Sequence, residues 1–294
     1  MIKIVKTQPM FYYLNKFPTL LKLVSFFGNY LFKFQTRKYN FNNVPVFSEI
    51  GIETFNRCNL DCSFCPANKF TDTRIPKLMD PKLFSKIIDE LVKINYKGKI
   101  SLFINNEPLL DKRLETFINE VSTKLPDAVL NIWTNGSLLT KERLHSLYNA
   151  GLKNLVIDNY SLKLQILPEI DQVIKSTNQN IIEKMNIKIW LRYKNIKLSN
   201  RSGLILNTKN DINHSTKCFY PFYFLNINPE GKVFICCNDT YYRNIVGDIN
   251  NQSLVQVWKN EQFLNIRKHL INTGRKNLIP CKECNVLKSS TGNI

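Results

Sequence analysis

Apolar residues follow two rhythms between residues 46 and 193. Short runs of alternating or continuous apolar residues predict β-strands, and apolar residues three and four positions apart predict helices. Strands are predicted over 46–55, 97–104, 128–134, 152–158 and 186–193. Helical segments separate these strands, which predicts an α/β fold with a parallel sheet and right-handed crossovers.

The predicted helices carry recognisable start and stop signals. Residues 79–94 read MDPKLFSKIIDELVKI, with Asp80 as the N-cap and Pro81 in the first turn. Thr140 precedes the helix that follows the third strand, and Gly151 ends it. Further helices are predicted over 111–124 and 161–184.

The pattern changes after residue 200. Residues 218–239 predict a hairpin with Pro229-Glu230-Gly231 as its turn, and residues 253–271 predict a helix. The chain therefore divides into an N-terminal aromatic and basic helical segment (1–45), a parallel α/β domain (46–200) and a small α+β domain (201–294).

The chain has 294 residues and a net charge of +18. Its basic residues are scattered and form no arginine-rich arm, which argues against a nucleic-acid partner. The apolar stretch within residues 10–39 is too short to cross a membrane. A helix packed on the main domain is expected there, and peripheral contact with a membrane surface is the alternative.

Eight cysteines occur in the chain, and no signal peptide is evident before them. A reducing cytoplasm is therefore expected, where clustered cysteines bind metal more often than they form disulfides. Short polar turns follow the predicted strands: NRCNLDC, NNEP, TNGS and DNYS. Since the carboxyl ends of parallel strands meet at one edge, these turns should surround one cavity.

Cys58, Cys62 and Cys65 have the spacing C-x3-C-x2-C. A disulfide uses two cysteines and a closed zinc site usually four ligands. Three thiolates on a cubane iron–sulfur cluster leave one iron open for a small chelating ligand. Three-thiolate zinc remains the alternative, although the three histidines (His145, His214 and His269) lie in no partner motif.

The segment CNLDCSFC, with Phe64 just before the third cysteine, resembles the signature of radical S-adenosylmethionine (SAM) enzymes. The resemblance implies a partial (β/α)6-type barrel and a [4Fe-4S] cluster that binds SAM. Reductive cleavage of SAM in that family yields a 5′-deoxyadenosyl radical, which abstracts hydrogen from the substrate.

The other turns extend the resemblance. NNEP (105–108) resembles the family's Gly-Gly-Glu-Pro turn, with asparagines in place of the glycines, and Glu107 would accept from the SAM amino group. Arg192 would pair with the SAM carboxylate. The residues implied to bind SAM are Phe64, Asn106, Glu107, Asn135, Asp158, Asn159 and Arg192.

The later cysteines resemble the auxiliary-cluster domain of many radical SAM enzymes, called SPASM or, in its one-cluster form, twitch. Structural zinc is the alternative on spacing alone. Adjacent side chains of an extended segment point opposite ways, so only one of Cys236 and Cys237 is expected on the cluster. The expected ligands of an auxiliary [4Fe-4S] cluster are Cys218, Cys236, Cys281 and Cys284.

A fully ligated cluster is suited to accept an electron, which predicts an oxidoreductase. In size and single-cluster layout the chain resembles radical SAM dehydrogenases that act on aminocyclitols or sugar alcohols. The resemblance implies dehydrogenation of a hydroxyl-bearing carbon of a small polar metabolite, such as a sugar or aminocyclitol, with a flavodoxin- or ferredoxin-type electron donor. Arg201 is the predicted substrate anchor. The alternatives are an epimerase with Cys237 as hydrogen donor, a peptide-modifying maturase and a non-catalytic zinc-binding protein.

Overall fold

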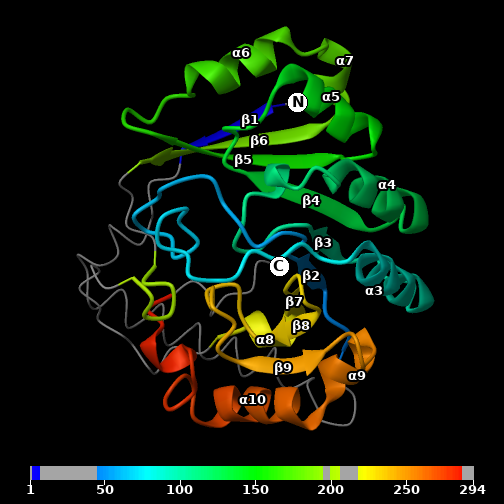
Figure 1. Ribbon diagram of the computed structural model, residues 1–294, viewed down its shortest axis with the longest axis vertical. Helices are drawn as coiled ribbons and strands as arrows, with labels where there is room; N and C mark the ends of the chain where they lie inside the picture. The colour runs from blue at the N-terminus through cyan, green and yellow to red at the C-terminus, as the bar shows by residue number, and fades with distance from the viewer. Residues whose placement is uncertain (1, 7–44, 195–198, 206–217, 287–294) are drawn as a thin grey trace.

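A single sheet runs through both predicted domains of the computed structural model, which describes residues 2–6, 45–194, 199–205 and 218–286. Its strand order is β1-β6-β5-β4-β3-β2-β7-β8-β9 (Figure 1). The strands are β1 (Ile2–Lys6), β2 (Glu49–Ile52), β3 (Lys99–Ser101), β4 (Val129–Thr134), β5 (Asn154–Ser161), β6 (Asn186–Tyr193), β7 (Phe224–Ile227), β8 (Lys232–Phe234) and β9 (Ile245–Asp248).

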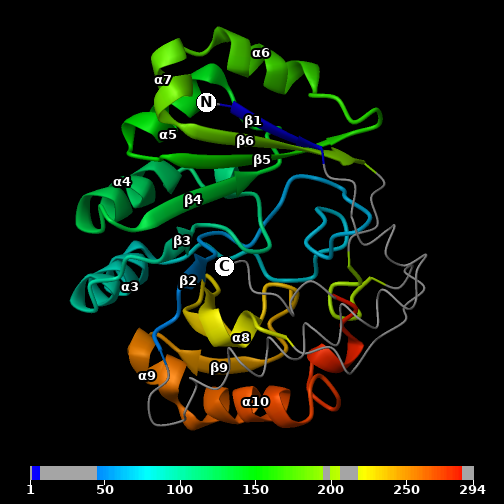
Figure 2. The same cartoon turned by 180° about the vertical axis from the view of Figure 1, so that it is seen from behind.

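The parallel part of the sheet, from β1 to β7, confirms the predicted α/β class. Helices cover its outer face, as Figures 1 and 2 show from opposite sides. Alternate strand residues, such as Ile52, Ile132 and Ile189, are fully buried in the core. The covering helices are α3 (Pro81–Lys93), α4 (Leu114–Lys124), α5 (Lys141–Asn149), α6 (Pro168–Ser176) and α7 (Gln179–Lys184).

The start of α3 confirms the signals read from the sequence. Asp80 accepts a hydrogen bond from the backbone N–H of Lys82 at 2.7 Å, and Pro81 occupies the first turn. The buried face of the helix consists of Phe84, Ile87, Ile88 and Leu91. The helix therefore follows its strand as a crossover that returns the chain to the start of β3.

The C-terminal part extends the sheet with antiparallel strands. The predicted hairpin is confirmed as β7 and β8, and Gly231 in its turn has a φ of 81°, which glycine adopts without strain. Because β7 also pairs parallel with β2, the small domain is joined to the barrel by backbone hydrogen bonds. Its helices are α8 (Tyr220–Tyr223), α9 (Leu254–Lys259) and α10 (Glu261–Asn272), and short 3-10 helices are η1 (Pro108–Leu110) and η2 (Cys281–Glu283).

Three predicted elements differ in the structure. The helix expected over 253–271 is two helices. Asn260 is the C-terminal cap of α9 through its backbone N–H, and its side chain accepts from Phe263 N to cap α10. The helical region 161–184 is likewise two helices, since Asn178 caps α7 after the break at Thr177. Within the predicted helical segment 1–45, residues 2–6 form β1 instead, and the amphipathic residues 10–39 lie outside the described residues.

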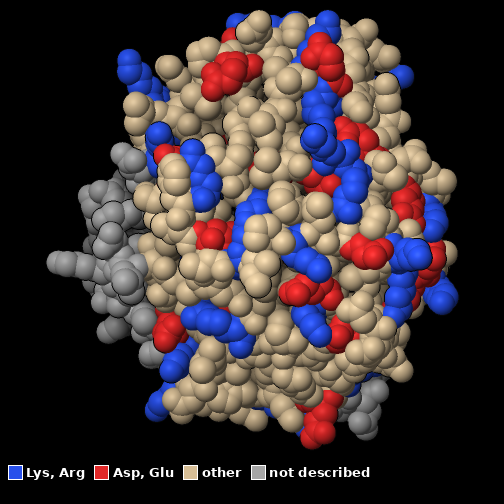
Figure 3. Space-filling view, in the orientation of Figure 1, with Lys and Arg blue, Asp and Glu red and all other residues tan. Residues whose placement is uncertain are grey.

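Acidic and basic side chains intermingle on the face shown in Figure 3, and the basic ones form no single stripe there. In the described part of the chain, no helix has the length and apolar character needed to cross a bilayer.

Arg267 holds the small domain together from inside. It is 1% exposed, its guanidinium lies 3.9 Å from the ring centroid of Trp258, and it donates to the backbone oxygens of Pro221 and Trp258. Arg267→Ala leaves both oxygens without this donor and removes the packed side chain. We expect a loss of about 3 kcal/mol, seen as a melting temperature lower by about 5–10 °C. Lys259→Ala, an exposed change on α9, should shift it by less than about 2 °C; equal shifts would contradict the assignment.

Candidate active site

The loop that carries the first three cysteines begins directly after β2, at the carboxyl edge of the sheet (Figure 1). A turn in which Cys65 N donates to Cys62 O at 3.0 Å brings two of the cysteines together. The ring of Phe64 packs on Tyr160 at the end of β5, with centroids 5.2 Å apart. The predicted meeting of this loop with another strand end is therefore present in the structure.

The donor set of this loop fits an iron–sulfur cluster. Burial, together with neighbouring negative charges, raises the pKa of the Cys58 thiol to about 11 and that of Cys62 to about 12. Iron must displace these protons, as metal binding to thiolates requires. In the described ranges, no three His, Cys, Asp or Glu side chains are placed to share a single metal ion. A cubane spreads its thiolates over different irons, and three thiolates leave one iron open.

A cavity of about 420 Å³ opens beside the cysteine loop. Its walls come from the loop itself, from the turn after β4 and from the end of β5 with the segment that follows. Residues that line it include Cys62, Asn135, Ser137, Tyr160, Ser161 and Ile170. Asn135 also points its amide Nδ2 at Cys58 Sγ, 3.9 Å away, so the cavity and the cysteines share a wall.

Glu107 ties the second turn to the third. Its buried carboxylate accepts from Thr134 Oγ1 at 2.6 Å, from Asn135 N at 2.8 Å and from Leu109 N at 3.0 Å. Burial raises the pKa of Glu107, and these three donors oppose the rise. The carboxylate thus fixes the position of Asn135 on the cavity wall. Its predicted contact with the SAM amino group remains a prediction.

The side-chain amide of Asn106 has one group with a hydrogen-bond partner and one without. Its side-chain oxygen accepts from Ile104 N at 3.0 Å, whereas its Nδ2 is buried and has no partner among the residues described. Buried polar groups are rarely left unpaired. A carboxylate or carbonyl oxygen of a bound ligand would satisfy this group, which fits the predicted SAM contact.

Asp158 and Arg192 face each other across β5 and β6. Arg192 Nε donates to Asp158 Oδ1 at 2.8 Å, and the guanidinium also lies 4.8 Å from the ring centroid of Trp190. Burial raises the pKa of Asp158, and Arg192 opposes the rise. Arg192 therefore already has a carboxylate partner, so pairing with a SAM carboxylate would place it between two acids.

Asn159 differs from its prediction. It follows Asp158 on β5 and so points to the other face of the strand, where it is fully buried. Its side chain donates to Gln165 O at 3.0 Å and accepts from Leu167 N at 2.8 Å. Asn159 holds the segment that leads to α6 and does not line the cavity.

The auxiliary cysteines meet in the small domain. Cys218, Cys236, Cys281 and Cys284 line one small buried cavity together with Arg275. Burial raises the pKa of Cys281, and the other three thiolates add to the rise, which shows that the four lie close together. Four thiols around one buried cavity fit a closed [4Fe-4S] cluster.

Cys237 lies next to this set but does not line its cavity. The chain bends at Ile235 and turns at 237, so the pair does not lie in a regular extended segment, yet only Cys236 lines the cavity. The Cys236 thiol donates toward Cys237, and this hydrogen bond lowers the pKa of Cys237. Asn238 directs its backbone N–H at Cys236 Sγ, 3.4 Å away, which supports Cys236 as the ligand.

Arg201 lies between the two cysteine sets. Burial would lower the pKa of Arg201, but the thiolates of Cys65 and Cys237 hold it above its ordinary value. The φ of Arg201 is 46°, a left-handed conformation that non-glycine residues adopt rarely. Its predicted role as a substrate anchor remains a prediction.

Sequence reasoning missed a row of aromatic rings on the inner face of the sheet. Phe103 stacks on Trp133 at 5.7 Å, and Trp133 contacts Trp190 at 5.7 Å. Each ring directly follows a buried core residue, so alternation turns it away from the helices. Trp190 Nε1 is buried without a partner in the described segments. The signal was present in the sequence as an aromatic residue near the carboxyl end of each strand.

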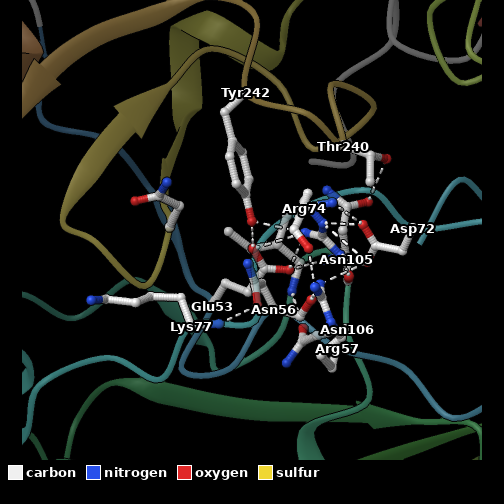
Figure 4. A network of polar contacts seen from close by, with 12 residues as sticks. Glu53, Asn56, Arg57, Asp72, Arg74, Lys77, Asn105, Asn106, Thr240 and Tyr242 are labelled. Atoms are coloured by element: carbon white, nitrogen blue, oxygen red, sulfur yellow. Dashed lines mark hydrogen bonds and ion pairs between the residues drawn. The ribbon is translucent and has the colours of Figure 1, made fainter. Parts of the chain in front are cut away.

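A second feature that was missed is the polar network of Figure 4, centred on Glu53 and Arg74. Arg74 Nη1 lies 3.3 Å from Glu53 Oε1, and Arg74 Nη2 lies 2.8 Å from Asp72 Oδ2. Tyr242 of the small domain accepts from Arg74 Nη1 at 2.8 Å. No short motif signals a contact between residues so far apart in the sequence.

Comparison with known proteins identifies both parts of the chain. Residues 52–211 match the radical SAM superfamily, and residues 218–285 match an iron–sulfur cluster-binding domain of the SPASM type. These matches confirm the predicted SAM and cluster cofactors and speak against the zinc alternatives.

Individual relatives give similar results. The S-adenosyl-L-methionine-dependent 2-deoxy-scyllo-inosamine dehydrogenase of Niallia circulans is 28% identical over 84% of this chain and 96% of its own length. The GTP 3′,8-cyclase of Aquifex aeolicus is 29% identical over 55% of this chain but only 49% of its own length. The crystal structure of BtrN in complex with AdoMet and 2-DOIA covers 85% of this chain and 97% of BtrN, with a TM-score of 0.73 and 26% identity.

The choice between Cys236 and Cys237 can be tested by counting iron. Cys236→Ser should lose about four irons per chain after anaerobic reconstitution, because it removes a ligand of the auxiliary cluster. Cys237→Ser should keep the wild-type iron and sulfide content. The reverse result would make Cys237 the ligand.

Glu107→Gln tests the carboxylate that positions Asn135. In the variant, one of the two accepting oxygens becomes an NH2 group, which cannot accept the hydrogen bond that Thr134, Asn135 or Leu109 donates to it. The turn should therefore shift. We expect the dissociation constant for SAM to rise at least about tenfold, or ~1.4 kcal/mol. Glu142→Gln, on the exposed start of α5, is the matched control and should bind SAM like wild type. Unchanged SAM binding in Glu107→Gln would show that this carboxylate is not required.

Proposed function

The chain belongs to the radical SAM superfamily, and we propose that it is an oxidoreductase that dehydrogenates a hydroxyl-bearing carbon of an aminocyclitol. The observation that carries the proposal is the placement of Arg201 beside thiols of both cysteine sets. A substrate held there would lie between the two cysteine sets. The similarity to the 2-deoxy-scyllo-inosamine dehydrogenase, over 96% of that protein, supports the choice of substrate class.

When bound, SAM and its cluster would supply the radical that takes a hydrogen atom, a base would take the hydroxyl proton, and the auxiliary cluster would accept the electron that remains. The protein contributes position and electrostatics. Glu107 and Asn106 shape the turn beside the SAM cavity, and Asn135 forms its wall. Arg201 provides a cation for the hydroxyl oxygen, which becomes more acidic once its carbon has lost a hydrogen atom.

The aromatic row of Phe103, Trp133 and Trp190 supports a ring-shaped substrate. Ligand sites are mostly apolar and carry a few placed polar groups. The C–H face of a cyclitol ring can pack on an indole, while its hydroxyls meet Trp190 Nε1 and the Asp158–Arg192 pair. Asp158 would recognise an amine, because burial raises its pKa and a cation nearby restores its charge.

We propose a flavodoxin- or ferredoxin-type protein as the electron donor, in a reducing cytoplasm where the cysteines stay free of disulfides and the seven proposed ligands can bind iron. The epimerase alternative would need Cys237 as a hydrogen donor. Its place beside Arg201 leaves that role open to experiment.

The test is anaerobic turnover with SAM, a reductant and 2-deoxy-scyllo-inosamine. We expect one ketone product per 5′-deoxyadenosine, with deuterium from the reacting carbon recovered in 5′-deoxyadenosine. Phe70→Ala, an exposed change outside the lining of the SAM cavity, is the matched control and should turn over like wild type.

Two outcomes would contradict the proposal. An epimer that carries solvent deuterium, abolished by Cys237→Ala, would indicate the epimerase. SAM cleavage without any oxidised aminocyclitol or sugar would remove the dehydrogenase assignment.

A further inference from the structure

The segment that follows auxiliary ligand Cys236 reaches the loop and turn of the SAM site. Tyr241 donates to Pro66 O at 3.4 Å, one residue beyond the third cysteine of the SAM site. Thr240 donates to the side-chain oxygen of Asn105 at 3.4 Å. Tyr242 donates to Glu53, as Figure 4 shows. Three consecutive residues of one domain therefore contact three separate parts of the other.

Glu53 is the centre of these contacts and is completely buried. It accepts from Asn105 N at 3.0 Å and pairs with Arg74. Burial raises the pKa of Glu53, while Arg74 and the Tyr242 hydroxyl oppose the rise. A buried carboxylate is stable only when its hydrogen-bonding and charged partners are present. The loss of one partner therefore changes the position of the others.

Arg74 carries the connection back to the cysteines. It donates to Asn105 O at 2.8 Å and pairs with Asp72 at 2.8 Å. Asp72 in turn pairs with Arg57 at 3.2 Å, and Arg57 directly precedes Cys58. The two ends of the cysteine loop are thus closed on each other by charges that Glu53 and Tyr242 hold in place.

The backbone of Tyr242 is strained, which is an independent sign that its position matters. Its φ of 54° lies in the left-handed region, which a bulky residue occupies only when its surroundings impose it. The ring packs on Phe234 of β8 with centroids 4.9 Å apart, and the guanidinium of Arg74 lies 5.6 Å from its centroid.

A chain of turns links Tyr242 to the auxiliary cysteine. Tyr242 N donates to Asp239 O at 3.1 Å, and Asp239 N donates to Cys236 O at 2.9 Å. A displacement of Cys236 would therefore move the Tyr242 hydroxyl away from Glu53.

We propose that Tyr242 is a positioning residue that couples the two cluster sites, so that SAM affinity at the first site depends on the auxiliary cluster being in place. The coupling runs from Cys236 through Tyr242 and Glu53–Arg74 to the cysteine loop. The inference rests on the proposed function only in requiring both clusters, and its test uses no substrate.

The experiment is a double-mutant cycle on SAM binding. The four proteins are wild type, Tyr242→Phe, Cys281→Ser/Cys284→Ser, and the combination of the three changes. SAM dissociation constants are measured anaerobically from the change that SAM causes in the electron paramagnetic resonance signal of the reduced first cluster. Loss of the auxiliary cluster should weaken SAM binding about tenfold, and Tyr242→Phe should do the same.

The combined variant should bind SAM no more weakly than either parent, because both changes break the same connection. Tyr96→Phe is the matched control. It removes the hydroxyl of another buried tyrosine, which donates to Lys99 O at 3.1 Å near the amino ends of the strands, and should leave SAM binding unchanged.

Wild-type affinity in Tyr242→Phe, or losses that multiply to about a hundredfold in the combined variant, would overturn the coupling. If Tyr242→Phe fails to hold the first cluster, hydrogen exchange in the iron-free proteins decides. The coupling requires faster exchange in residues 57–74 for Tyr242→Phe than for Tyr96→Phe, and equal exchange would overturn it.

Discussion

The buried carboxylate of Glu53 is the constraint on which the arrangement of the site depends. A charge at the end of a central strand, completely removed from water, is tolerated only with a full set of partners. Those partners come from three segments: the turn after β3 (Asn105), the end of the cysteine loop (Arg74) and the small domain (Tyr242). The pairing of β7 with β2 brings the third segment within reach, so sheet and charge network depend on each other.

Glu107, after the neighbouring strand β3, is a second buried carboxylate whose partners come from several segments. Its carboxylate collects donors from β4, from the turn after β4 and from its own turn. Both acids follow short strands and both fix loops that surround the cavity. These acids therefore fix the positions of the loops more than they raise the free energy of unfolding, because a buried ion pair or hydrogen-bonded acid adds little stability compared with apolar residues of the same volume. The aromatic row of Phe103, Trp133 and Trp190 supplies apolar surface on the inner face of the sheet.

Signals from neighbouring residues in the sequence predicted much of this structure. Contacts between residues far apart in the sequence could not be predicted. The Asp80 cap, the alternation of strands and the polar turns depend on neighbours within a few residues, and all three appear in the structure. The break at Asn260 was missed because a capping residue inside an apolar pattern reads as an ordinary helix position. The contact between Arg74 and Tyr242 joins positions 168 residues apart, and only the folded sheet brings them together. Strand β1 was missed because an edge strand that buries little has a weak apolar pattern.

The arginines of the site divide by the partner that each one faces. Arg74 and Arg192 lie against carboxylates, so their charge is balanced in the protein itself. Arg201 faces the thiolates of Cys65 and Cys237, and the pKa of Cys237 is lowered by its hydrogen bond with Cys236. Arg275 faces the thiols of the auxiliary set, where burial raises the pKa of Cys281 and Cys284. Such thiols become anionic only when iron replaces their protons. Arg275 would therefore gain its countercharge when the auxiliary cluster assembles, and it would in return stabilise the negative charge of the ligated thiolates. Of these four cations, Arg201 is the one that faces thiolates of both the cysteine loop and the small domain, and this is the basis for proposing it as the substrate anchor.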